Sequence, residues 1–327
     1  MSEKIAIVNV NSYGRDFPEF ITKLEAFGEV KKFMFDQNAT PDELVSELDG
    51  YTYIILGTHP TFTKEFFEKN NSVRLIARHG LGFNNVDLKA AKEHGVYVTR
   101  EENVIEQDAV AETAVSLIHA VARCIPVANK MVHDGEWKVN RARLMGYQLR
   151  NKTTGIIGYG NIGRRVGEIM KYGYKNKILA YDPYLPVEKA EEYGIELCTL
   201  EELLAQSDFI SLHCFLTPEN EKMINAENIK LMKRSAILIN CARGKLVDEE
   251  AVAKAVKNRD IFGYGADTTA SEPINEDNEL LKLDHVILSP HVGVYTLECT
   301  HDMNKKVYED IELVHNGKRP KVIINEM

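Results

Sequence analysis

Short runs of apolar and β-branched residues alternate with helical patterns along almost the whole chain of 327 residues. Runs of this kind, bounded by turn residues and separated by helices, are typical of buried strands in parallel sheets. We expect strands at residues 5–10, 31–35, 53–56, 74–77 and 96–98, and a second series at 153–157, 177–181, 209–213, 236–240, 261–266 and 285–288. The alternation therefore predicts an α/β chain with two parallel sheets.

Helical patterns precede and follow the second series of strands. Residues 108–132 have the pattern of a long helical stretch, and residues 296–316 that of an amphipathic helix ended by Gly317. Thr40, Pro41 and Glu43 form a capping-box sequence with proline at the first helical position, which predicts a helix start. No low-complexity linker joins the two series. We therefore expect two α/β lobes with a cleft between them, where open parallel sheets bind ligands.

The charge balance excludes some partners. The chain has 40 Lys and Arg against 49 Asp and Glu, a formal net charge of −9. This excess of carboxylates disfavours nucleic acid, which needs a basic face. The five cysteines include no C-x-x-C and the histidines no H-E-x-x-H spacing, so we expect free thiols and no metal.

The apolar stretch over residues 109–127 is interrupted by Glu112, His119 and Arg123, and the first residues contain no run typical of a signal peptide. A membrane span needs about 20 consecutive, mostly apolar residues. We therefore expect no membrane partner and a cytoplasmic location.

A glycine motif gives the clearest indication of a ligand. Gly158, Gly160 and Gly163 stand between a predicted strand and a predicted helix, and Asp182 ends the next strand, about 20 residues further on. These glycines allow a tight turn, close approach of a pyrophosphate and close helix–strand packing, and the acid binds a ribose. The context favours a dinucleotide site over a purely structural turn. Because Asp182 would repel the extra phosphate of NADP, we expect NAD.

Three potential catalytic side chains, Arg243, Glu272 and His291, each follow a strand of the second series. The carboxyl ends of parallel strands lie at one edge of a sheet, so we expect these side chains to converge. An arginine presents a planar fork of donors to a carboxylate or carbonyl. A histidine whose pKa is raised by a carboxylate can give a proton to a developing alkoxide.

In several motifs the chain resembles the D-isomer-specific 2-hydroxyacid dehydrogenases. The matching segments occur in the same order over nearly the whole chain: Arg78-His79-Gly80-Leu81-Gly82-Phe83-Asn84-Asn85-Val86-Asp87-Leu88, Ala109-Val110-Ala111-Glu112, residues 239–249 and residues 280–293. The resemblance implies two doubly wound parallel-sheet domains, with the Rossmann NAD domain inserted into a flavodoxin-like substrate domain. We expect the substrate domain at 1–102 and 297–327, the NAD domain at 103–296, and hinges near residues 103 and 296.

The resemblance also implies roles for single residues in the reversible reduction of a 2-oxo acid to a D-2-hydroxy acid with NADH. His291 would be the acid/base, Glu272 its partner, and Arg243 the group that binds the 2-oxo carboxylate. Substrate contacts are expected from His79, Gly80, Leu81, Gly82 and Tyr295. Cofactor contacts are expected from Gly158, Gly160, Asn161, Ile162, Gly163, Asp182, Cys214, Phe215, Asn220, Cys241, Ala242, Arg243 and Asp267.

The family is typically homodimeric, so the resemblance further implies a homodimer formed through the helices after residue 108. A non-enzymatic function also stays open, because corepressor-like scaffolds in the same family bind NAD(H) without significant turnover. Such relatives can keep the arginine, the glutamate and the histidine. Turnover of NADH with a small-molecule 2-oxo acid separates the enzyme from the scaffold.

Overall fold

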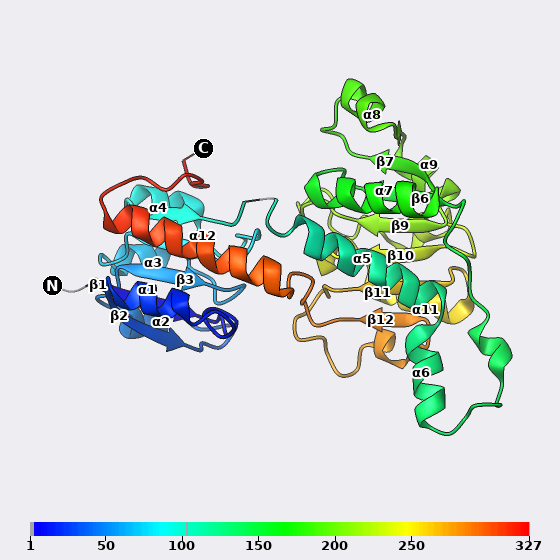
Figure 1. Ribbon diagram of the computed structural model, residues 1–327, viewed down its shortest axis with the longest axis horizontal. Helices are drawn as coiled ribbons and strands as arrows, with labels where there is room; N and C mark the ends of the chain where they lie inside the picture. The colour runs from blue at the N-terminus through cyan, green and yellow to red at the C-terminus, as the bar shows by residue number, and fades with distance from the viewer. Residues whose placement is uncertain (1–2, 103, 327) are drawn as a thin grey trace. The chain divides into compact units, whose positions relative to one another are not determined.

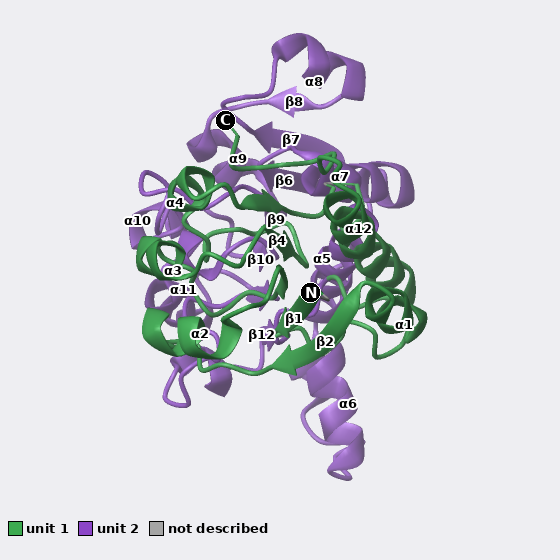
Figure 2. Cartoon of the chain, turned by 90° about the vertical axis from the view of Figure 1, so that its left-hand side faces the viewer, with its two compact units in different colours: residues 1–106, 294–327 green, residues 107–293 purple. Residues whose placement is uncertain are grey.

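The computed structural model describes residues 3–102 and 104–326, which form two compact units. Unit 1 comprises residues 1–106 and 294–327, and unit 2 comprises residues 107–293 (Figure 2). The chain thus leaves unit 1 after residue 106 and returns to it at residue 294. The expected borders were 102/103 and 296/297, and residue 103, the expected first hinge, lies outside the described residues.

Within the described residues, unit 1 is built on a five-stranded parallel sheet in the order β2-β1-β3-β4-β5. This is the order of the flavodoxin-like doubly wound sheet. The strands are β1 (Glu3–Val8), β2 (Gly28–Phe33), β3 (Tyr53–Leu56), β4 (Leu75–Arg78) and β5 (Tyr97–Thr99). The helices are α1 (Glu19–Glu25), α2 (Pro41–Leu48), α3 (Lys64–Lys69), α4 (Leu88–Glu93) and α12 (Leu297–His315).

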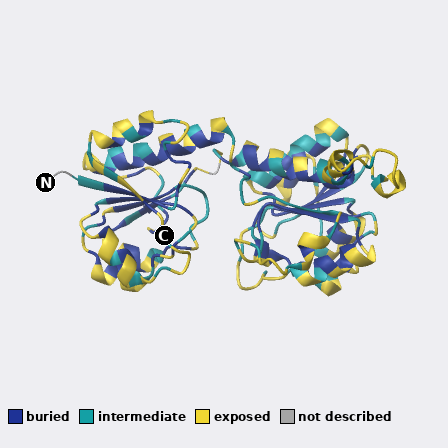
Figure 3. Ribbon diagram, turned by 90° about the horizontal axis from the view of Figure 1, so that it is seen from below, coloured by how far each residue is buried: buried dark blue, intermediate teal, exposed yellow. Residues whose placement is uncertain are grey.

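Local sequence explains several of these elements. Every residue of β3 and β4 is buried, as expected for central strands covered on both faces (Figure 3). Helix α2 starts as predicted, because Thr40 Oγ1 accepts from Glu43 N and the Glu43 carboxylate accepts from Thr40 N. Helix α12 buries Val307, Ile311 and Val314 in the same apolar cluster as residues of β1 and β3. The C-terminal segment therefore completes the core of unit 1.

Unit 2 has, over its described residues, a seven-stranded parallel sheet in the order β12-β11-β10-β9-β6-β7-β8 (Figure 1). This is the Rossmann order with a seventh strand. The strands are β6 (Thr153–Ile157), β7 (Lys177–Tyr181), β8 (Glu196–Leu197), β9 (Phe209–Leu212), β10 (Ile237–Asn240), β11 (Gly263–Ala266) and β12 (Val286–Leu288).

Helices lie on both faces of this sheet (Figure 3). They are α5 (Gln107–Ala122), α6 (Ile125–His133), α7 (Asn161–Tyr174), α8 (Val187–Tyr193), α9 (Leu200–Gln206), α10 (Ala226–Ile229) and α11 (Glu249–Asn258), with short 3₁₀ turns η1 (Arg141–Leu144), η2 (Gly244–Leu246) and η3 (Glu279–Lys282). The predicted fold class, two doubly wound parallel sheets in two domains, is confirmed.

The predicted helical stretch over residues 108–132 is divided into two helices. Helix α5 ends at Ala122 and α6 begins at Ile125, with Cys124 between them in the left-handed region at φ 52°. Pro126 is the reason: it fits the first turn of a new helix, but it has no N–H for a helix that continues from α5. No single described helix is long and apolar enough to cross a membrane; α5 and α6 reach that standard only as a pair, bent by 61°.

Candidate active site

The three predicted catalytic side chains follow neighbouring strands of unit 2. Arg243 comes after β10, Glu272 after β11 and His291 after β12, and these strands are adjacent and parallel. His291 Nδ1 lies 2.8 Å from Glu272 Oε2, and the two side chains are 37% and 38% exposed. The structure therefore brings the imidazole and the carboxylate into contact at the carboxyl edge of the sheet. Both side chains are partly exposed to solvent, and the charge of Arg243 influences both of them.

The electrostatics of this pair favour a protonated histidine. The hydrogen bond to Glu272 raises the pKa of His291 above its usual value, and the charge of the Glu272 carboxylate acts in the same direction. Burial and the charge of Arg243 act to lower this pKa, but they are outweighed. Burial acts to raise the pKa of Glu272, but the hydrogen bond and charge of His291 outweigh it, as does the N–H of Thr269, and the pKa is lowered. An imidazolium held by a carboxylate is the state required of a proton donor.

The loop that carries His291 is anchored on Asp267, a contact that the sequence analysis did not predict. Asp267 Oδ1 accepts hydrogen bonds from Ser289 Oγ at 2.5 Å and Val292 N at 3.0 Å, and Oδ2 accepts one from Gly293 N at 2.8 Å. The carbonyl of Asp267 accepts from His291 N. His291 has φ 54°, which side-chain-bearing residues seldom adopt, so these bonds hold the imidazole in place. The expected cofactor contact of Asp267 stays a prediction.

The glycine motif forms the turn from β6 into α7. Gly158 has φ 87°, and a Cβ there would lie 2.7 Å from Cys214 N, whereas a Cβ on Gly163 would lie 2.1 Å from Gly158 O. Gly160 has open space where its Cβ would be, and it caps α7 with no side-chain hydrogen bond among the described residues. The first N–H groups of α7 are therefore open to an anion. These residues fit the pyrophosphate of a dinucleotide.

Asp182 follows β7 and lies beside this turn. Its Oδ2 accepts from Tyr159 N at 2.8 Å and its Oδ1 from Tyr184 N at 2.9 Å. The other predicted cofactor residues lie at the start of α7 and on the turns after β9 and β10: Asn161, Ile162, Cys214, Phe215, Asn220, Cys241 and Ala242. Asn220 Nδ2 donates to Phe215 O at 2.7 Å, which closes the turn after β9. The predicted cofactor residues thus gather where the strand order of the sheet reverses, as in dinucleotide sites.

Residues 115–293 match the family model described as "D-isomer specific 2-hydroxyacid dehydrogenase, NAD binding domain". The chain belongs to this family. The predicted family and the predicted cofactor, NAD, are confirmed. Membership of this family indicates an NAD-dependent 2-hydroxyacid dehydrogenase.

Similar proteins cover both units of this dehydrogenase. The glyoxylate reductase of Korarchaeum cryptofilum is 36% identical over 320 residues, 95% of this chain and 94% of that protein. The D-3-phosphoglycerate dehydrogenase of Methanocaldococcus jannaschii is 37% identical over 92% of this chain, which spans only 56% of that protein. The crystal structure of D-lactate dehydrogenase from Aquifex aeolicus, complexed with NAD and lactic acid, has a TM-score of 0.85 at 26% identity and covers 99% of each chain.

The predicted substrate residues of the dehydrogenase lie in unit 1. His79, Gly80, Leu81 and Gly82 form the loop directly after β4, and Tyr295 precedes α12 with 57% of its surface exposed. His79 Nε2 lies 2.9 Å from Asn304 Oδ1 on α12. Burial lowers the pKa of His79 to about 4, so this histidine is neutral at pH 7. It therefore cannot contribute a positive charge to substrate binding, and its loop offers backbone N–H groups instead.

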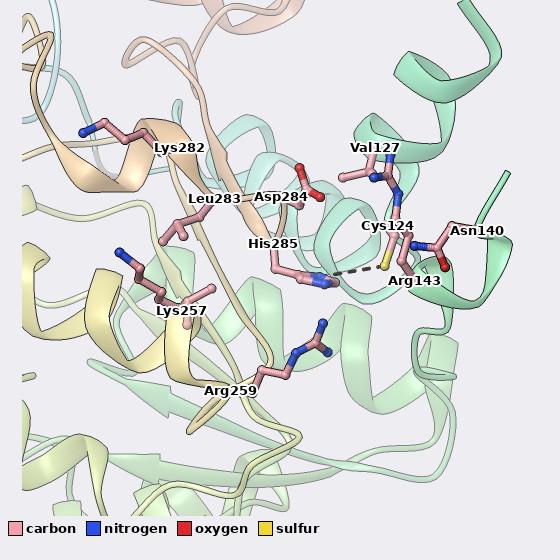
Figure 4. Close-up of a pocket in the computed structure, with 11 residues that line it drawn as sticks. Cys124, Val127, Asn140, Arg143, Lys257, Arg259, Lys282, Leu283, Asp284 and His285 are labelled. Atoms are coloured by element: carbon pink, nitrogen blue, oxygen red, sulfur yellow. Dashed lines mark hydrogen bonds between the residues drawn. The ribbon is translucent and has the colours of Figure 1, made fainter. Parts of the chain in front are cut away.

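A cavity of about 440 Å³ in unit 2 lies at the other edge of the sheet (Figure 4). Its lining includes Cys124, Arg143, Arg259 and His285. His285 precedes β12, whereas His291 follows that strand, so the two histidines belong to opposite ends of it. Open parallel sheets bind ligands outside the carboxyl ends of their strands. The cavity is therefore not part of the candidate active site.

A first prediction concerns the carboxylate beside His291. In the predicted role of His291 as proton donor, reduction requires the protonated imidazole, whose population falls as pH rises through its pKa, and Glu272→Gln removes the main cause that raises this pKa. We expect the falling limb of kcat/KM for reduction to move to lower pH, so that activity is lost first at the alkaline end. The control is Glu276→Gln, which changes an exposed glutamate nearby. An unchanged profile for Glu272→Gln would show that another group sets the pKa of the proton donor.

Proposed function

We propose that the chain reduces a 2-oxo acid to the D-2-hydroxy acid, and catalyses the reverse oxidation, with Arg243, Glu272 and His291 as the reacting machinery. The observation that carries the proposal is the 2.8 Å contact between His291 Nδ1 and Glu272 Oε2. His291 follows β12, Glu272 follows β11, and Arg243 follows β10, three consecutive strands of the sheet. A histidine paired with a carboxylate at the carboxyl edge of a dinucleotide-binding sheet suits proton transfer to a carbonyl oxygen.

In the proposed reaction His291, Glu272 and Arg243 have different roles. Because Nδ1 of His291 is held by Glu272, Nε2 is the nitrogen that gives its proton to the carbonyl oxygen in reduction and takes it back in oxidation. Glu272 keeps the imidazole charged until the proton leaves. The guanidinium of Arg243 binds the 2-oxo carboxylate and stabilises the negative charge that grows on the oxygen. When bound, NADH would supply the hydride that is added to C2 of the 2-oxo acid.

The glycine turn and Asp182 support NADH over NADPH in this reaction. The N–H groups at the start of α7 suit a pyrophosphate, and the carboxylate of Asp182 suits ribose hydroxyls. A second phosphate on the ribose would meet this carboxylate and be repelled. We therefore propose NADH as the working reductant of the site.

The test is the loss of NADH absorbance on addition of 2-oxo acids to the full chain. The panel contains glyoxylate, pyruvate, longer aliphatic 2-oxo acids and a phosphorylated 2-oxo acid. We expect turnover with at least one of them and a D-configured product by chiral chromatography. Tight NADH binding without turnover on any of them would overturn the enzyme proposal in favour of the scaffold.

A homodimer is a further part of the proposal. Large apolar side chains are exposed on α6 and in the segment that follows it: Ile125, Val132, Trp137, Val139 and Met145. Exposed apolar patches of this kind mark protein–protein contacts. They support pairing of two chains through the region after residue 108, while the cytoplasmic location stays a prediction.

A further inference from the structure

The loop over residues 79–82 is fixed through its carbonyl groups. Arg78 is 3% exposed, and its guanidinium donates to Gly82 O at 2.7 Å and to the carbonyls of Leu56 and Gly57. Glu101 N donates to Gly80 O at 3.4 Å. Because the carbonyls of Gly80 and Gly82 are bound from within unit 1, the N–H groups of residues 80–82 are the means by which the loop can bind an outside ligand.

Two N–H groups of the loop already have acceptors: His79 N donates to Leu56 O at 3.0 Å, and Leu81 N donates to a side chain. Glu106 Oε1 accepts a hydrogen bond from Leu81 N at 2.9 Å, and Glu106 is only 7% exposed. The same oxygen lies 3.8 Å from the position that a Cβ on Gly80 would take. A carboxylate of the chain thus occupies the position for which the carboxylate of a 2-oxo acid would compete.

We propose that Glu106 is an internal competitor for the substrate, whose carboxylate must displace that of Glu106 from the Leu81 N–H before it can bind. The inference rests on the proposed function, in which the loop binds the carboxylate of the 2-oxo acid. One N–H cannot make a full hydrogen bond to two carboxylates at once. Two carboxylates close enough to share that N–H also repel each other. Glu106 thereby sets KM for the substrate without taking part in the chemistry.

Glu101 is a second buried carboxyl group close to this loop. Glu101 is 1% exposed, and neither of its carboxyl oxygens has a hydrogen-bond partner among the described residues. Burial raises its pKa well above the usual value, and the charges of Glu106 and Asp310 act in the same direction, against Lys306 and Arg78. Of these two side chains, Glu106 is the one that accepts a hydrogen bond from an N–H of the loop.

The test compares Glu106→Ala and Glu106→Gln with the parent chain. Glutamine has the same shape and can still accept from Leu81 N, but it is uncharged and forms the weaker hydrogen bond. If the loop is occupied by Glu106 about nine-tenths of the time, the alanine variant binds substrate about tenfold more tightly. We expect KM for the best 2-oxo acid, and the Kd of oxamate measured by calorimetry with NADH present, to fall about tenfold in Glu106→Ala and less in Glu106→Gln. We expect kcat to stay within about twofold.

The matched control is Glu102→Gln, an exposed glutamate of the same segment, for which we expect no change in KM or Kd. A rise or no change in KM and Kd in both Glu106 variants would overturn the inference and give Glu106 a supporting role in the loop. If Glu106→Ala fails to fold by thermal melting, the glutamine variant, which keeps the shape, decides between these results. If the parent chain binds neither oxamate nor any 2-oxo acid, the proposed function of the loop fails, which is a separate outcome.

Discussion

His291→Ala is expected to lower kcat for reduction by roughly 10²- to 10⁴-fold, the usual contribution of a positioned general acid. The affinity for NADH should stay near that of the parent chain, because the glycine turn and Asp182 belong to the other half of the sheet in unit 2. Steady-state rates and a fluorescence titration with NADH measure the two quantities separately. The combination of a large loss in kcat and an unchanged Kd would identify His291 as a group of the chemical step.

The matched control is His285→Gln. His285 belongs to the same short segment of unit 2, but it precedes β12, and burial lowers its pKa. We expect a kcat near that of the parent chain for this variant. A His291→Ala enzyme with near-parental kcat would mean that another group donates the proton.

Arg243→Ala is expected to lower kcat/KM for 2-oxo acids by roughly 10²- to 10³-fold, since the loss of one preorganised donor costs about 2.7–4 kcal/mol in the transition state. Arg243→Lys keeps the charge but not the planar fork, so we expect it to recover only part of the loss. The pH profile gives a second readout. Because Arg243 lowers the pKa of His291, Arg243→Ala should move the alkaline limb to higher pH, the reverse of the effect of Glu272→Gln.

A KM for 2-oxo acids that does not change in Arg243→Ala would argue against a substrate contact. A pH profile that does not move would argue that the arginine is too far from His291 to influence it. The matched control is Arg234→Ala, which removes an exposed arginine before β10 and leaves the carboxyl edge of the sheet intact.

Much of the fold was predictable because buried parallel strands leave a strong local pattern. The strands over residues 53–56, 153–157 and 177–181 begin and end as expected. Strand β8 was not predicted, because its two residues at the sheet edge are too few to show a pattern. The break between α5 and α6 was missed for another reason: the apolar pattern continues across it, and only Pro126 and the left-handed Cys124 reveal it.

The candidate site was predictable to the extent that topology determines it. Residues after parallel strands share one edge of a sheet, which is why Arg243, Glu272 and His291 could be selected together. The hydrogen bonds of Asp267 to the His291 loop and of Glu106 to Leu81 were not predictable, because they join groups far apart in sequence through backbone N–H atoms. Residue types and their spacing do not predict hydrogen bonds of this kind.

The insertion of unit 2 has a consequence for how the protein is made. Helix α12, which supplies Val307, Ile311 and Val314 to the core of unit 1, is synthesised after the whole of residues 107–293. Domains generally fold as units while the ribosome is still working. Unit 2 can therefore fold first, while part of the apolar surface of residues 1–106 is still uncovered because α12 has not yet been synthesised. The first segment to leave the ribosome thus completes its core only after the last helix has been synthesised.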